Sequence, residues 1–125
     1  MKRLILATAA AAALLLPAHP AAASAPKLDA GLGVYDDRLW VIVTPPRTFT
    51  PRTRPKSIEV SVAGASYTLK PESGDARRSD WLSRKLSPRR VSSLWGRKAR
   101  IRIGTRSGVV ELRRPMPPEP AQAVP

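Results

Sequence analysis

The chain has 125 residues, of which 22 are Lys or Arg and 9 are Asp or Glu, and its formal net charge is +13. It contains no cysteine and one histidine, His19. Disulfides, thiolate ligands and cysteine nucleophiles are therefore excluded, and any triad or zinc site that needs histidine would depend on that one residue.

The N-terminal segment has the parts of a secretory signal peptide. Lys2 and Arg3 form a cationic start, an apolar run follows over residues 4–16, and small residues occupy positions 21–23. The apolar run is shorter than the about 20 residues that span a bilayer, which favours a cleaved signal over a retained membrane anchor. We therefore predict a signal peptide over residues 1–23, with cleavage after Ala23.

Cleavage would remove His19 and leave a chain with neither histidine nor cysteine. The short, alanine-rich signal indicates a bacterial protein that is periplasmic or secreted, with no transmembrane segment after cleavage. The chain that remains is long enough for one domain with one modest core. We expect no enzyme, no metal site and no cofactor, because the side chains that most often carry such chemistry are missing.

The first predicted hairpin covers residues 31–44. Apolar residues dominate both halves, and Asp36 and Asp37 interrupt them in a way that is typical of a tight turn. The unbroken apolar run 39–43 is rich in β-branched residues, which favours a central strand covered on both faces. The two aspartates are interpreted as turn residues rather than as a metal or catalytic site.

Residues 44–56 contain four prolines. Proline cannot donate to a strand ladder and favours extended geometry in the residue before it, so a stiff, basic loop is predicted. Cations beside an aromatic ring can also grip a polysaccharide, nucleotide or peptide. An ordinary connection that protects a sheet edge is the favoured interpretation, and ligand contact is the alternative. The candidate contact residues of this loop are Arg47, Phe49, Arg52 and Arg54.

Alternating apolar and polar residues predict two more hairpins, over residues 58–70 and 98–112. Together the three hairpins give about six strands in a single domain over residues 24–114. The predicted fold is mainly β, a small antiparallel sandwich or open barrel with one or two short helices. Residues 115–125 contain five prolines and are predicted to form a flexible tail.

The helices are predicted between the second and third hairpins. Ser79 can cap a short helix that contains Trp81, and Ser87 before Pro88 is a preferred opening of a second helix that contains Trp95. All three tryptophans of the chain are interpreted as core residues, because a small domain with few aromatic residues needs their area. An aromatic shelf for sugar rings is the less favoured alternative.

Basic residues concentrate in the C-terminal half, where residues 77–114 hold thirteen basic and two acidic side chains. Alternate positions of a predicted strand carry three of the cations, which places them on one face at roughly 7 Å spacing. That spacing can follow an anionic polymer, and arginine can hold phosphate through two N–H groups. A solubilising surface charge explains the surplus equally well. The candidate anion-binding residues are Arg97, Lys98, Arg100, Arg102, Arg106 and Arg113.

Three functions stay open at this point. The first is a small, non-catalytic envelope protein that binds an anionic surface or polymer, such as lipopolysaccharide, membrane phosphate or cell-wall polymer. The second is an accessory or inhibitor domain that binds another exported protein through the proline-rich loop and the tail. The third, a carboxylate-based hydrolase, is disfavoured because no paired-acid motif is present. No motif accompanies the charge to predict a specific nucleic-acid partner, and the sequence does not specify an oligomeric state.

Overall fold

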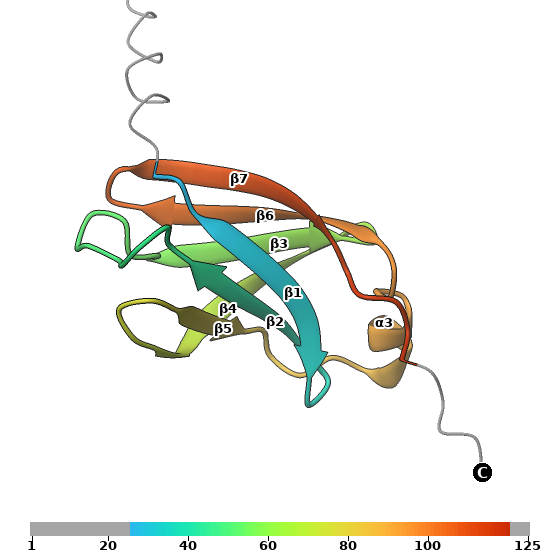
Figure 1. Cartoon of the computed structure of the whole chain (residues 1–125). Helices are drawn as coiled ribbons and strands as arrows, with labels where there is room; N and C mark the ends of the chain where they lie inside the picture. Colours follow the sequence, from blue (N-terminus) through green and yellow to red (C-terminus); the bar gives the residue numbers. More distant parts are fainter. Residues whose placement is uncertain (1–25, 121–125) are drawn as a thin grey trace, which may run out of the picture.

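The computed structural model describes residues 26–120 (Figure 1). The predicted signal peptide, its cleavage point after Ala23 and the last five residues of the predicted tail lie outside this range. Within the described range, no helix is both long enough and apolar enough to cross a membrane.

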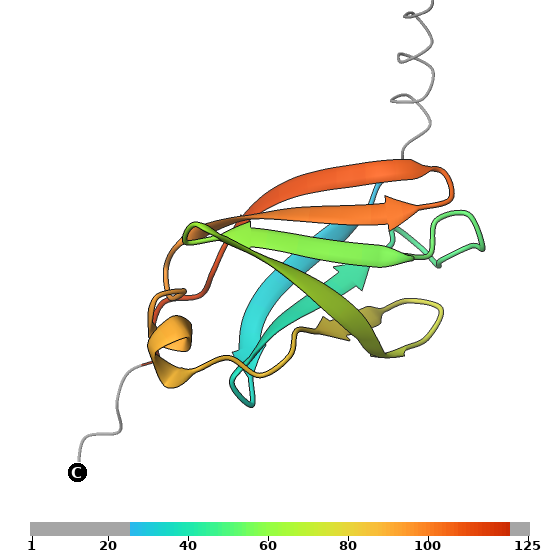
Figure 2. The ribbon, with the colours of Figure 1, turned by 180° about the vertical axis from the view of Figure 1, so that it is seen from behind.

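Over residues 26–120, the fold consists of seven antiparallel strands and one short helix, which confirms the mainly β prediction. The strands form one sheet that curves into a nearly closed barrel (Figures 1 and 2). The elements in chain order are β1 (Asp29–Tyr35), β2 (Arg38–Thr44), β3 (Ser57–Val62), β4 (Ala65–Gly74), β5 (Ser79–Leu82), α3 (Pro88–Ser92), β6 (Lys98–Thr105) and β7 (Gly108–Pro115).

The first and last strands of the sheet meet at a seam. Pairing joins the strands in the order β1-β2-β5-β4-β3-β6-β7, so β1 and β7 are its two ends, and curvature brings them into contact. Arg114 of β7 donates a hydrogen bond to the carboxylate of Asp29 on β1 at 2.8 Å. This hydrogen bond lowers the pKa of the Asp29 carboxyl, and the ion pair bridges the seam.

Alternate residues of the strands fill the barrel interior. Leu39, Val41 and Val43 of β2 have no exposed surface, and neither have Ile101 and Ile103 of β6. Burial of these side chains is the main stabilising contribution, because each removes a full aliphatic side chain from water. Lys98, Arg100 and Arg102 alternate with the buried residues of β6 and face outward, which confirms the predicted alternation of that strand.

The helix predicted at Ser79 is wrong, because residues 79–82 form strand β5 between β2 and β4. The backbone of β2 needs a second neighbour for its N–H and C=O groups, and β5 supplies it by pairing Trp81 with Val41. The Ser79 hydroxyl accepts a hydrogen bond from Trp81 Nε1 at 2.7 Å instead of capping a helix. The sheet therefore has seven strands rather than the predicted six.

The second predicted helix begins as expected and is α3, but it ends at Ser92, so Trp95 lies in the turn that follows rather than in the helix. The side chain of Ser87 accepts a hydrogen bond from the backbone N–H of Arg90 at 3.2 Å, and Pro88 occupies the first helical position. Trp81 lies in the core as predicted, with 4% of its surface exposed, although a strand carries it. Trp40 and Trp95 are only partly buried, so the assignment of all three tryptophans to the core is wrong for these two.

The packed chain extends beyond the predicted domain boundary at residue 114. Met116 is 2% exposed, and its backbone N–H donates to the Arg97 carbonyl at 2.8 Å. The Pro117 carbonyl accepts a hydrogen bond from Gly96 N–H at 2.9 Å. These hydrogen bonds and the burial of the Met116 side chain in the core together hold residues 115–117 against the start of β6.

Among the described residues, the Tyr67 hydroxyl is buried without a hydrogen-bond partner. On folding, such a hydroxyl loses its hydrogen bonds to water and gains none within the protein, so its burial is unfavourable. We therefore expect Tyr67→Phe to leave the free energy of unfolding unchanged or to raise it by up to about 1 kcal/mol. Urea denaturation measures this, with Tyr35→Phe at an exposed tyrosine as the matched control. A clear loss of stability in Tyr67→Phe alone would contradict the expectation.

Candidate anion-binding face

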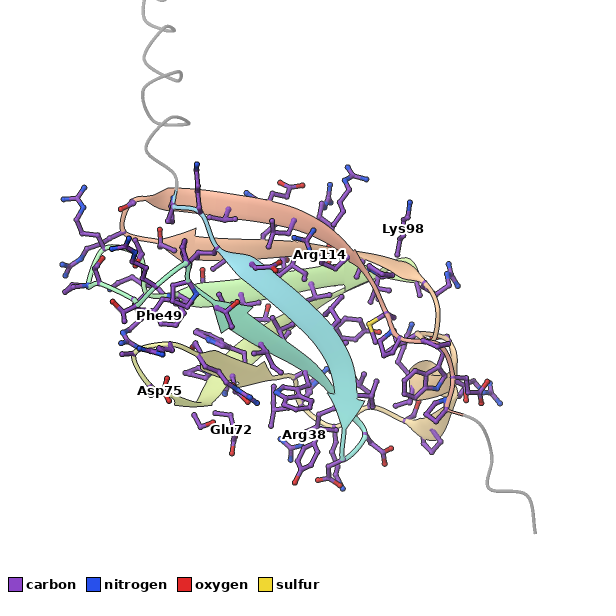
Figure 3. All side chains as sticks on the ribbon, in the orientation of Figure 1. Arg38, Phe49, Glu72, Asp75, Lys98 and Arg114 are labelled. Carbon is purple, nitrogen blue, oxygen red and sulfur yellow. The ribbon has the colours of Figure 1, made fainter. Side chains whose placement is uncertain are left out.

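Outward side chains of β6 and β7 form one charged surface, which we call the cationic face. Alternation along β6 places Lys98, Arg100 and Arg102 on the outside, and all three are exposed. Arg113 of β7 is exposed directly opposite Arg100. Lys98 points away from the barrel at the beginning of β6 (Figure 3). The structure therefore brings together four of the six predicted anion-binding residues.

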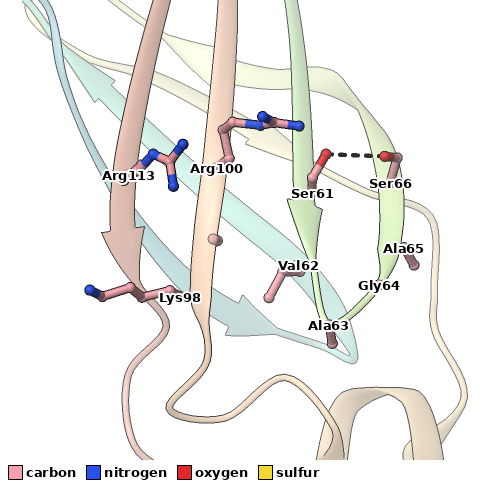
Figure 4. A pocket seen from close by; sticks show the side chains of 10 residues that line it. Ser61, Val62, Ala63, Gly64, Ala65, Ser66, Lys98, Arg100 and Arg113 are labelled. Atoms are coloured by element: carbon pink, nitrogen blue, oxygen red, sulfur yellow. Dashed lines mark hydrogen bonds between the residues drawn. The ribbon is translucent and has the colours of Figure 1, made fainter.

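A shallow hollow of about 400 Å³ lies beside the cationic face, between β6 and the turn that joins β3 to β4 (Figure 4). Ser61 of β3 is paired with Arg100, and Ser66 of β4 is paired with Ser61. The two hydroxyl oxygens are 3.1 Å apart. One row across four strands thus presents two guanidinium groups, from Arg113 and Arg100, followed by two hydroxyls. No carboxylate lines the hollow.

The β3–β4 turn keeps the hollow open. Ala63 and Gly64 both have positive φ, at 53° and 78°, as a two-residue hairpin of the type that matches strand twist requires. Val62 and Ala65 flank this turn, and neither carries a large side chain that would fill the space above it. The hydroxyls and cations beside the turn are therefore accessible to a ligand.

Carboxylates compensate one part of the cationic face and leave the other free. A carboxylate oxygen of Glu111 lies 3.5 Å from Arg100 Nε, and the other lies 3.8 Å from Arg102 Nε. On the other side of β6, Glu59 of β3 lies opposite Arg102 in the strand register. These groups are about half exposed, so each ion pair contributes little in water. The two other cations of the face, Lys98 and Arg113, have no ion pair within residues 26–120. The uncompensated charge is therefore next to the hollow.

Two predicted anion-binding residues lie outside the cationic face. Arg97 directly precedes β6 and is exposed at the end of the strand where the face begins. Arg106 lies in the turn between β6 and β7, at the far end of β6. It is eight residues beyond Lys98, or roughly 26 Å along an extended strand. An anionic group bound at the hollow therefore cannot contact Arg106, which only a longer polymer would reach.

Arg106 lies instead beside the proline-rich loop. The loop is held in place because Lys56 N–H donates to the Gly104 carbonyl at 2.7 Å and Ser107 N–H donates to the Arg52 carbonyl at 3.2 Å. A second hollow of about 400 Å³ forms there, and it is lined by Pro51, Arg54, Pro55, Lys56 and Arg106.

Phe49, predicted as a ligand contact, lies in the core rather than on the surface of the loop. The ring belongs to the core and is 7% exposed, and the Phe49 N–H donates to the Ala76 carbonyl at 2.7 Å. The guanidinium carbon of Arg54 lies 5.2 Å from the ring centroid, so the cation–π contact is internal. Arg47 and Arg52 are exposed, and the loop therefore offers cations to a partner but no aromatic surface.

The two serines of the hollow were not among the predicted site residues. The alternation of Ser61 with buried valines indicates an outward side chain, but the pairing of β3 with β6 joins segments about 40 residues apart. Their place beside the cations therefore could not be read from either segment alone.

Within residues 26–120, no three His, Asp or Glu side chains gather in a way that could hold a metal ion. No family model matches the sequence, and comparisons with curated proteins and with solved structures give no match.

Proposed function

We propose that this protein binds an anionic polymer or surface through the cationic face, without catalysis. The observation that supports this most is the row of Arg113, Arg100, Ser61 and Ser66 beside an open hollow that no carboxylate lines. Guanidinium groups bind phosphate, sulfate or carboxylate oxygens with two parallel N–H bonds, and the hydroxyls add further donors. The predicted signal peptide would deliver the protein to the cell envelope, where polymers that carry such groups are abundant.

The contacts of such a complex are exposed to water. Each one is weak on its own, because solvent and salt screen charges at a surface. Affinity then comes from several anionic groups that bind along the alternating cations of β6 and β7 at once. Strong dependence on salt concentration is the expected signature of this mode of binding.

The double substitution Arg100→Glu and Arg113→Glu is expected to weaken binding to lipopolysaccharide or peptidoglycan roughly tenfold or more, because it reverses the charge at the hollow. The measurement is retention of the protein without residues 1–23 on these two matrices, on dextran sulfate and on neutral dextran, across a salt series. Circular dichroism checks that the variant is folded.

The matched control is Arg77→Glu with Arg89→Glu, which changes the net charge equally at exposed positions away from the cationic face. Retention of the control variant should follow that of the wild type on the envelope polymer. Equal losses in the two double variants would show that net charge alone governs binding. Easy elution of the wild type from every anionic matrix at physiological salt would contradict a specific site.

A further inference from the structure

Strand β4 has a neighbour on both sides over only part of its length. Its pairing with β5 covers Lys70 to Gly74, whereas its pairing with β3 begins at Ala65. Over residues 65–69, the described chain pairs with β4 on the β3 side alone. Figure 2 shows β4 diverging from the segment that follows β5. The barrel wall therefore contains a free strand edge.

The register decides which backbone groups are free. Val62 and Ala65 flank a two-residue turn, so they form a hydrogen-bonded pair, and hydrogen-bonded pairs alternate along an antiparallel ladder. Ala65, Tyr67 and Leu69 therefore bond to β3. The N–H and C=O groups of Ser66 and Thr68 point the other way, into the gap, and pair with no backbone group of residues 26–120.

The opposite wall of the gap is the segment after β5. Its backbone is bonded to the β2 side, since Ser83 N–H donates to the Leu39 carbonyl at 2.9 Å and Leu86 N–H donates to the Asp37 carbonyl at 2.8 Å. A groove of about 970 Å³ lies between this segment and β4. We call it the edge groove.

The lining of the edge groove indicates the chemistry of a partner. Tyr67 and Leu86 pack against the core and lie on its inner side, while Lys70 and Arg84 are exposed at its rim. Of the charged side chains that line the groove, five are basic and one is acidic: Arg38, Lys70, Arg84, Lys85, Arg90 and Glu72. A strand in the groove would meet apolar surface on one face and cations on the other.

We propose that the edge groove binds an extended acidic segment of a partner protein, which adds a strand to β4 through the backbone of Ser66 and Thr68. Strand addition to a free sheet edge obtains affinity from main-chain hydrogen bonds and specificity from alternate side chains. The partner segment alternates carboxylates, which face the rim, with apolar residues that face Tyr67 and Leu86. The edge groove shares Ala65 and Ser66 with the hollow beside the cationic face. It uses the backbone of Ser66 rather than its hydroxyl, and this proposal does not depend on the one above.

Charge decides against a second copy of this chain as the occupant. Two copies that pair through β4 would bring the same basic rim residues together across the joint. Like charges that meet in this way oppose association, whereas a carboxylate-bearing strand neutralises them.

The test uses a short blocked peptide that alternates Glu and Val, together with the same peptide N-methylated at its central residues. Methylation preserves charge and side chains but removes backbone donors. We expect the unmethylated peptide to bind roughly tenfold more tightly or better, as measured by calorimetry. It should also slow amide hydrogen exchange at Ser66 and Thr68, while Tyr67, which already bonds to β3, changes little.

Two protein variants complete the test. Thr68→Pro removes a donor in the groove and should abolish binding, whereas Thr68→Ala keeps the donor and should bind normally. Binding should also survive in the Arg100→Glu and Arg113→Glu variant, which separates the two sites. Equal binding of both peptides, no binding of either, or unchanged exchange at Ser66 and Thr68 would overturn the proposal. So would a dimer in which these amides are protected without peptide.

Discussion

Replacement of Met116 by alanine is expected to lower the free energy of unfolding by about 2–5 kcal/mol, as large-to-small substitutions in cores do. Met116 is 2% exposed, and its backbone continues the pairing of β7 with the residues before β6. Removal of its side chain would leave a cavity where the end of the chain closes the core. Urea denaturation of the protein without residues 1–23 gives the difference directly.

Two controls show whether packing causes the loss. Met116→Leu nearly preserves volume and should cost less than about 1.5 kcal/mol. Val109→Ala, at a position with 52% of its surface exposed, should change stability little. A Met116→Ala variant as stable as the wild type would mean that the segment after β7 does not pack as described.

Replacement of Asp80 by alanine is expected to cost about 1.5–3 kcal/mol at neutral pH, the range for hydrogen bonds to charged groups. Asp80 is 8% exposed. Its carboxylate accepts hydrogen bonds from Arg78 Nε at 2.6 Å, from Arg78 Nη2 at 2.9 Å and from Trp40 Nε1 at 3.2 Å. Its loss removes these three side-chain hydrogen bonds, which connect β5 to the loop before it and to β2.

The same carboxylate makes stability depend on pH. The hydrogen bonds from Arg78 hold the pKa of Asp80 below its ordinary value, although burial opposes this. The unfolded chain therefore takes up the proton first as pH falls. The stabilisation is complete above about pH 5 and is lost as the pH falls from about 4 toward the pKa of the folded state.

Urea denaturation between pH 7 and pH 2 measures this contribution. The difference in stability between the wild type and Asp80→Asn should shrink as the solution becomes acidic. Glu72→Gln, at an exposed carboxylate, should follow the wild type throughout. A constant difference between Asp80→Asn and the wild type at every pH would contradict the assignment.

Local patterns predicted the parts of the structure that depend on neighbours in sequence. The alternation over 98–105 identified the outward cations of β6, because a strand places successive side chains on opposite faces. Ser87 before Pro88 identified the beginning of α3, because capping involves only the first helical turn. The same local reasoning failed at Ser79, because a serine shortly before Trp81 and Leu82 is compatible with a helix cap as well as with the strand that the structure contains.

Local sequence patterns were sufficient to predict the mainly β class, the outward charge of β6 and the beginning of α3, since each follows from the period of side chains or from one turn of chain. Strand pairing, which local patterns do not reveal, places Ser61 beside Arg100, places Arg106 next to the proline-rich loop and leaves β4 with a free edge. These features depend on which strands pair and where pairing stops. That choice is made by burial of the whole core, to which residues distant in sequence contribute together.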